Sequence, residues 1–314
     1  MLLETSAAAA ALGAVAYGAG DFLGGCATRR IAAFGVVAIA QTVAMLFMFQ
    51  HFTLEGASLP EGAESGVAVL AGVAYAVGLM TLYHGFANGR IAIVAPLCGL
   101  FGILVPLLGD IVLSRHIAPV QFLGIVICGF AVYLIAGVGA TERGGGRTSW
   151  SIRLGIVSGM AYGVADLCLG MMPVEASTGA LLVTRGVAAF LAASLVLVMV
   201  TRLATVPVPV RIDGAGLAPA VPPEAAATPF SAFVAPGVMA SVLLATAAGA
   251  FDMAGHVGYV HAATRGSMGV AAALVALFPA VTVALAVIVL KERVSRVQCL
   301  GFAIAMSGVV LLVE

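Results

Sequence analysis

Two aspartates lie inside long apolar stretches of this chain and follow nearly the same short sequence. Residues 16–21 read AYGAGD and residues 161–166 read AYGVAD, so Asp21 and Asp166 are offset by 145 residues (166 − 21). A charge at the centre of a bilayer costs about 2.5–3.5 kcal/mol even on a lenient insertion scale, so it needs a partner or a role. Tyr17 and Tyr162 each come one helical turn before the aspartate and share its helix face. The repeat therefore predicts a polar site within a membrane, built from both halves of the chain.

Four further polar residues lie inside apolar stretches. Arg185 aligns with Gln41 (185 − 41 = 144), so only the second half carries a cation at this position. Asp252 and His256 are four residues apart, which places them on one face of a helix. We expect Asp166, Arg185, Asp252 and His256 to form a polar cluster beside a central cavity. The arginine would neutralise one aspartate and leave the other free to exchange protons; a fully satisfied structural network is the alternative.

The composition excludes most soluble classes of protein. Of 314 residues, 62% are hydrophobic and 9% are charged, whereas an ordinary soluble domain has about 25% charged residues. The formal net charge is zero, so nothing suggests a nucleic-acid partner. The five cysteines are scattered and odd in number, which argues against a disulfide framework or a zinc site. No P-loop motif is present, so ATP is not expected to drive this protein, and we expect neither cofactor nor metal.

Ten stretches are apolar and long enough to cross a bilayer. A hydrocarbon core of about 30 Å requires roughly 20 residues of helix, and the loops between most stretches are short and polar. Glycine and alanine are abundant in them, as expected for helices that pack closely in lipid. The predicted spans are Ser6–Cys26, Phe34–Phe52, Gly66–Ala87, Ile91–Leu113, Val120–Val138, Ile152–Met172, Gly179–Thr201, Ala232–His261, Ser267–Leu290 and Val297–Val313.

The spans divide into two related units. We predict a first repeat over residues 1–140, a linker over 141–151 and a second repeat over 152–314, with a flexible, proline-rich loop at 203–231. Because each repeat has five spans, an odd number, the two must insert with opposite orientation. The predicted fold is an all-α integral membrane protein of ten transmembrane helices, arranged as two inverted five-helix repeats.

The ends of the repeats resemble a known family. Residues 120–124 read VQFLG and residues 297–301 read VQCLG, an offset of 177 (298 − 121), and LKERV at 290–294 comes shortly before the second copy. This pattern resembles the end of an EamA domain, and the whole chain resembles a ten-helix member of the drug/metabolite transporter superfamily. One departure stands out: the family has a glutamate before its fifth helix, and Arg115 stands where the second half has Glu292.

The resemblance implies a secondary transporter rather than an enzyme. A small metabolite, amino acid or drug would bind near the midplane among helices one to four and six to nine, and export is the direction implied. Proton coupling is a hypothesis that depends on the unpaired carboxylates. Helices five and ten, which lack intramembrane charge, would lie outside and support homodimer contacts. The expected partners are thus a small solute, the lipid bilayer and a coupling proton or ion, in a bacterial inner membrane.

The sequence is compatible with more than one orientation in the membrane and with more than one function. The positive-inside rule places the termini outside, because Lys and Arg crowd the opposite loops, whereas the family resemblance implies cytoplasmic termini. Residues 18–21 (GAGD) match the short pattern of intramembrane aspartyl proteases, whose two carboxylates share a proton. Inverted repeats would instead separate Asp21 from Asp166 across the midplane, which disfavours a protease. A passive channel is the other alternative.

Overall fold

The protein is a bundle of long helices. The computed structural model describes residues 2–114, 145–205, 236–265, 278–292 and 294–313, together with short pieces of the intervening segments. The prediction of an all-α membrane protein is confirmed, since five of the described helices are long and apolar enough to cross a membrane. The helices are α1 (Leu2–Ala27), α2 (Ala33–Glu55), α3 (Ala63–Asn88), α4 (Ile91–Ser114), α6 (Gly145–Gly170), α7 (Val174–Thr205), α9 (Pro236–Arg265), α11 (Phe278–Leu290) and α12 (Arg296–Val313).

Eight of the ten predicted spans coincide with described helices over most of their length. Most of the fifth span, Val120–Val138, and the first part of the ninth lie outside the described residues. Helix α6 begins at Gly145, inside the segment predicted as a linker. Within the predicted long loop, α7 continues to Thr205, and two short strands, β1 (Ile212–Asp213) and β2 (Gly216–Leu217), pair antiparallel.

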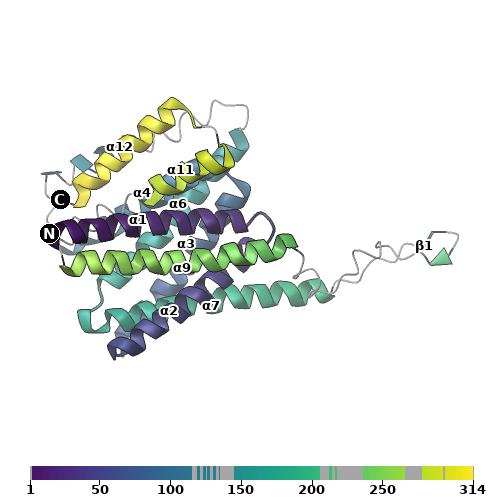
Figure 1. Ribbon diagram of the computed structural model, residues 1–314, viewed down its shortest axis with the longest axis horizontal. Helices are drawn as coiled ribbons and strands as arrows, with labels where there is room; N and C mark the ends of the chain where they lie inside the picture. The colour runs from purple at the N-terminus through teal and green to yellow at the C-terminus, as the bar shows by residue number, and fades with distance from the viewer. Residues whose placement is uncertain are drawn as a thin grey trace.

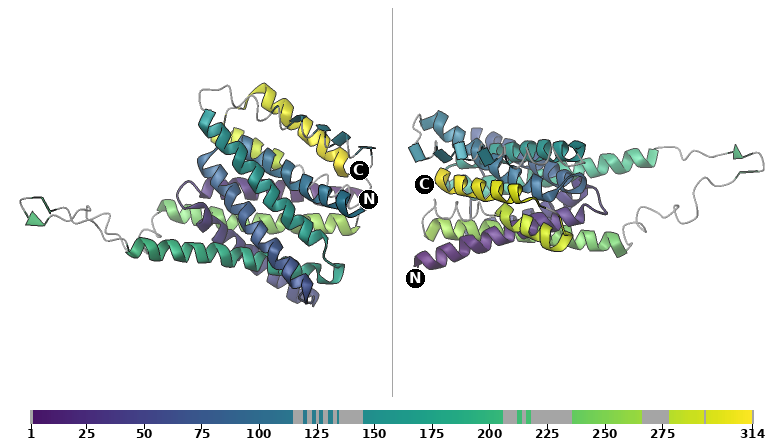
Figure 2. Two further views of the ribbon diagram at one scale, coloured as in Figure 1. Left: turned by 180° about the vertical axis from the view of Figure 1, so that it is seen from behind. Right: turned by 90° about the horizontal axis from the view of Figure 1, so that it is seen from above.

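The helices form two bundles, and each bundle takes helices from both halves of the sequence. In the first bundle α9 packs along α1 and α2, and α11 packs on α1; in the second, α6 packs along α3 and α4, and α7 packs on α3. The bundles meet where α2 contacts α7 and where α4 contacts α11. Figure 2 shows that the long helices lie side by side and cross one another obliquely, with α3 and α6 inclined to α9 in the left view.

Helices α1 and α6, the first helices of the two halves, run in opposite directions. Gly24 and Gly25 of α1 contact Tyr83 and Phe86 of α3, so the C-terminal ends of α1 and α3 lie together. Gly89, just after α3, contacts Ser151 near the beginning of α6. Helix α6 therefore starts where α1 ends, as the predicted inversion requires.

Small residues set the distance between helices in the same way in both halves. A methyl group on Gly72 of α3 would lie 3.0 Å from the carbonyl oxygen of Thr184 in α7. Gly249 of α9, 177 residues later, contacts the backbone of Ala40 in α2, 144 residues before Thr184. Because helices in lipid associate by close packing rather than by the hydrophobic effect, a side chain at either glycine would separate them.

The two ends of the bundles differ in charge. Arg29, Arg30 and Arg153 are exposed where α1 ends and α6 begins, and Lys291 lies nearby; this is called the basic end below. Four exposed or half-buried glutamates lie at the opposite end, called the acidic end. They are Glu55, Glu61, Glu64 and Glu175, in the α2–α3 and α6–α7 connections and the adjoining helix termini. Figure 1 shows the N- and C-termini together at the acidic end.

Candidate functional site

A buried ion pair lies in the middle of the molecule. The Nη1 atom of Arg185 in α7 lies 2.6 Å from Oδ2 of Asp252 in α9, and the two side chains are 3% and 19% exposed. The sequence predicted these residues to meet, and the structure brings them into direct contact. Removing one partner of such a pair leaves an uncompensated charge at low dielectric, which is far more costly than losing an exposed pair.

Tyr75 of α3 connects both charges. Its hydroxyl accepts a hydrogen bond from Arg185 Nη1 at 2.6 Å and donates to Asp252 Oδ1 at 3.3 Å. Its ring lies 4.4 Å from the guanidinium carbon, within cation–π range, and meets the ring of Tyr162 edge-on at 5.0 Å. Sequence reasoning missed Tyr75. Its position could have revealed it, because Tyr75 lies at the middle of the third predicted span and is the repeat equivalent of Asp252 (252 − 75 = 177).

Gln41 of α2 completes what is called the central network: Gln41, Tyr75, Arg185 and Asp252. Arg185 Nη1 donates to Gln41 Oε1 at 3.2 Å, and Gln41 is 1% exposed. Gln41 is the repeat equivalent of Arg185, as Tyr75 is of Asp252. Each pair of equivalents is therefore in direct contact, as would be expected of residues close to an axis relating the two halves.

The network also joins the two bundles. Gln41 and Asp252 belong to the first bundle, whereas Tyr75 and Arg185 belong to the second. The ion pair and the hydrogen bonds from Tyr75 to Asp252 and from Arg185 to Gln41 all cross between bundles. The network lies near the middle of the long helices, so polar groups hold the bundles together far from both ends of the helices.

Tyr17 and Tyr162, the two predicted tyrosines, occupy matching environments. The Tyr17 ring covers Gly255 of α9, and the Tyr162 ring covers Gly78 of α3. Gly78 and Gly255 are themselves repeat equivalents (255 − 78 = 177). Both tyrosines are half-buried, and each ring fills the space left by a glycine of the neighbouring helix.

The remaining predicted residues surround the central network at a longer range. Asp21 is half-buried and close enough to Asp252 to be affected by its charge. Asp166 is exposed and lies within electrostatic range of Arg185, as does the half-buried His256. The two repeated aspartates thus approach different members of the network. This arrangement differs from that of a protease dyad, whose carboxylates must be adjacent.

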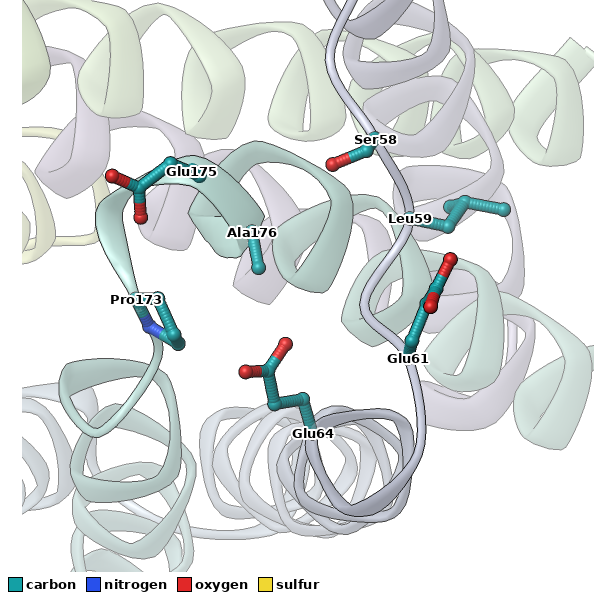
Figure 3. Close-up of a pocket in the computed structure, with 7 residues that line it drawn as sticks. All are labelled: Ser58, Leu59, Glu61, Glu64, Pro173, Glu175 and Ala176. Carbon is teal, nitrogen blue, oxygen red and sulfur yellow. The ribbon is translucent and has the colours of Figure 1, made fainter.

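Two open hollows among the described residues lie away from the central network, and the cavity expected beside the network stays a prediction. The larger, of about 350 Å³, lies at the acidic end between the beginnings of α3 and α7 (Figure 3). Three glutamates line it, and within the described residues no group of three or more metal-binding side chains could hold a metal ion. Its lining residues are Ser58, Leu59, Glu61, Glu64, Pro173, Glu175 and Ala176. The second, of about 260 Å³, is mainly apolar and is lined by Ala33, Phe34, Met80, Thr81, His84, Leu154 and Leu195.

Comparison with known proteins decides the family. The EamA-like transporter family matches residues 149–314, which is more than half of the chain. The chain belongs to the EamA-like transporter family. The predicted resemblance is therefore confirmed, and it makes this protein a multi-pass membrane transporter. No curated protein matches the sequence significantly. One crystal structure of another protein aligns over 97% of this chain and 95% of its own, with a TM-score of 0.54 and 14% identity, and so shares the fold.

In this EamA-like transporter the LKERV segment has a defined contact. The two carboxylate oxygens of Glu292 accept hydrogen bonds from the backbone N–H groups of Ile91 and Ala92, at 3.3 and 3.1 Å. Lys291, the preceding residue, has a φ of 55°, in the left-handed region that non-glycine residues seldom adopt. The segment after α11 thus caps the N-terminus of α4, a helix of the other bundle.

Proposed function

We propose that this protein is a secondary transporter that moves a small metabolite, amino acid or drug across a bacterial inner membrane by alternating access, most simply as an exporter. The observation that carries the proposal is the central network, which joins two bundles at mid-membrane and lies between repeat equivalents. A carrier needs two bodies that move about such a point. Its ten helices would form two inverted repeats, residues 1–140 and 152–314, joined by 141–151.

The network has a mechanical role in this proposal. The bundles would rock about the Gln41–Arg185 and Tyr75–Asp252 contacts, because atoms on a two-fold axis move least when the repeats exchange conformations. The solute would bind beside the network, where Tyr17 and Tyr162 offer an aromatic face and a hydroxyl. The positive-inside rule makes the basic end cytoplasmic.

Asp21 and Asp166 are the proposed coupling residues. Each lies within electrostatic range of a different member of the ion pair, Asp21 of Asp252 and Asp166 of Arg185, without joining that pair. A carboxylate in such a place can be neutralised by a proton or by a positively charged group of the solute. Loading one carboxylate at a time would couple the movement of the bundles to a proton gradient.

Flux measurements on the Asp21 and Asp166 variants test this function. A thermal-shift screen of metabolites at two pH values would first identify a ligand, because ligand binding raises the apparent stability of the folded state. Proteoliposomes would then report uptake of that ligand under an imposed pH gradient. We expect Asp21→Asn and Asp166→Asn each to reduce gradient-driven flux at least tenfold with normal expression. Glu175→Gln, an exposed carboxylate at the acidic end, should retain it.

The same vesicles separate a carrier from the alternatives. A carrier saturates and exchanges labelled for unlabelled solute without a gradient, whereas a channel does neither. Unaltered flux in both aspartate variants would remove these residues from the mechanism. Saturable flux that ignores the pH gradient would retain the carrier and reject proton coupling.

A further inference from the structure

We propose that an anionic phospholipid binds at the basic end, with an acyl chain in the apolar hollow and its phosphate at Arg153. The apolar hollow is the smaller of the two hollows described above, of about 260 Å³, and α2, α3, α6 and α7 form it. This binding does not depend on the proposed transport function. Three features support it: the depth and position of the hollow, an arginine without an acidic partner inside a membrane span, and the side chains at the rim.

The apolar hollow lies within the membrane, close to the surface at the basic end. All of its lining residues belong to helical segments that are long and apolar enough to cross a bilayer. Ala33 and Phe34 are the first two residues of α2, and His84 lies four residues before the end of α3, so the hollow is near the ends of these helices. An open, mainly apolar space offers water few hydrogen-bond partners. At this depth a lipid acyl chain fills it.

Both bundles contribute to the walls of the hollow. Helix α2 belongs to the first bundle, whereas α3, α6 and α7 belong to the second. Ala33 of α2 and Met80 of α3 both pack against the largest cluster of buried apolar residues, so the hollow has a well-packed floor. A chain in this hollow therefore contacts the two bundles at once, unlike a lipid that lies against the outside of one helix.

Arg153 supplies the charge that selects an anionic headgroup. It is exposed, it lies inside the candidate membrane span Thr148–Gly170, and it immediately precedes Leu154, which lines the hollow. Within the described residues no acidic side chain pairs with it. A cation inside a membrane span is costly, and a long arginine side chain lowers this cost by extending toward the interface. There its planar N–H groups can bind a lipid phosphate in a bidentate manner.

Trp150 and His84 form the rim of the hollow on the headgroup side. Their rings meet edge-on at 6.2 Å, and Asn88 Nδ2 donates a hydrogen bond to the backbone carbonyl of His84 at 3.1 Å. Trp150 is 41% exposed and lies one helical turn before Arg153 and Leu154, on the same side of α6. Tryptophan is enriched at the level of the lipid headgroups. The phosphate that Arg153 reaches is therefore at the depth of Trp150.

The repeat does not reproduce this site in the first half of the chain. The offset of 145 relates Arg153 to Ala8 and Trp150 to Thr5, so the equivalent positions carry neither a cation nor a tryptophan. The site thus belongs to the basic end, which the positive-inside rule places in the cytoplasm. Basic pockets between membrane helices on that side bind anionic lipid headgroups in other proteins.

The fluorescence of Trp150, the only tryptophan in the sequence, reports on the site directly. The protein is reconstituted in phosphatidylcholine vesicles that contain a variable fraction of a lipid with brominated acyl chains, because bromine quenches a nearby tryptophan. Brominated phosphatidylglycerol should quench Trp150 at about a fivefold lower fraction than brominated phosphatidylcholine, since one arginine near the surface favours an anionic lipid by about that factor. Lipids that merely surround the protein would quench equally in both forms.

Three variants separate this site from the general charge of the basic end. Arg153→Gln should abolish the preference for phosphatidylglycerol. Arg30→Gln, the matched control, removes the same charge from an exposed arginine whose side chain lies against Gly237 of α9, and it should keep the preference. Ala33→Leu adds volume inside the hollow and should raise the fraction of phosphatidylglycerol that is needed.

Three results would overturn the inference. The first is equal quenching by the two brominated lipids in the wild type. The second is a preference for phosphatidylglycerol that Arg153→Gln retains, or that Arg30→Gln removes as fully as Arg153→Gln does. The third is a preference that Ala33→Leu leaves unchanged, which would place the lipid outside the hollow. None of these results affects the flux experiment or the transport function.

Discussion

The two halves of this transporter agree in how their helices pack and differ in where their charges lie. Tyr17 covers Gly255 as Tyr162 covers Gly78, and the glycines that bring helices together recur at the same offsets. At the centre, however, the neutral pair Gln41 and Tyr75 is matched by a charged pair in the second half. The packing contacts are thus shared by the two halves, whereas the charged and polar contacts at the centre are not.

The difference is informative because it falls on contacts between bundles. Arg185 and Asp252 contact their own equivalents, Gln41 and Tyr75, so charge on one side of the axis is balanced within the network. Glu292 and Gly24 make contacts between the bundles at the basic end, and Arg115 and Leu169 stand at their equivalent positions in sequence. Substitutions that make one half resemble the other therefore test which differences matter.

The largest effect is expected from Arg185→Gln, which gives the second half the residue of the first. Asp252 would then be buried without its cation, at a cost of about 3–5 kcal/mol in the free energy of unfolding. Thermal unfolding of the purified protein in detergent measures this. Arg185→Gln combined with Asp252→Asn should recover much of the loss, because no lone charge remains. A single variant as stable as wild type would contradict the assigned ion pair.

A smaller effect is expected from alanine at the two tyrosine-covered glycines. A Cβ atom at Gly255 would lie 2.6 Å from the Tyr17 ring, whereas one at Gly78 would lie 3.2 Å from the Tyr162 ring. Overpacking costs about 1–3 kcal/mol, so Gly255→Ala should unfold at a clearly lower temperature than Gly78→Ala. If Gly78→Ala proved the more damaging of the two, the packing comparison would be wrong.

The smallest effect is expected where a hydroxyl distinguishes the halves. Thr282, which is fully buried, donates to the carbonyl of Gly18 at 3.1 Å, and Val105 is its equivalent beside Gly163. Thr282→Val should lose about 0.5–1.5 kcal/mol, the net worth of one hydrogen bond. Val105→Ile, which alters size rather than polarity, serves as the matched control in the same melting experiment. Thr282→Val without a measurable loss would show that this bond contributes nothing.

Much of the fold could be predicted from the sequence, because long apolar stretches admit one structure in lipid. The repeat also placed Asp21, Asp166, Arg185 and Gln41 inside helices. Charge pairing predicted that Arg185 would neutralise one aspartate, but it did not say whether the partner is Asp166 or Asp252. The interleaving of the bundles could not be predicted, since nearly every span offers glycine and alanine for packing.

The contacts of two residues, Tyr75 and Glu292, could not be predicted from the sequence, for physical reasons. A tyrosine in the middle of a span, such as Tyr75, is equally compatible with core packing and with a polar site. Only its contact with Asp252 in the structure reveals its polar role. The contact of Glu292 joins residues about 200 positions apart in the chain, and a carboxylate near a helix end normally caps its own helix. Neither partner could be found from local spacing.

The central claim is that transport requires the two bundles to separate in turn at each end. A Cβ atom at Gly25 would lie 3.2 Å from Cβ of Phe86, near the range of about 3.5–4.5 Å found in disulfides. In a cysteine-free background, oxidised Gly25→Cys/Phe86→Cys locks the basic end, whereas Gly20→Cys/Phe251→Cys, 3.3 Å apart, links α1 to α9 within one bundle. We predict that oxidation abolishes ligand flux in the first pair, that reduction restores it, and that the second pair transports throughout. Undiminished flux through the fully cross-linked first pair would contradict the account.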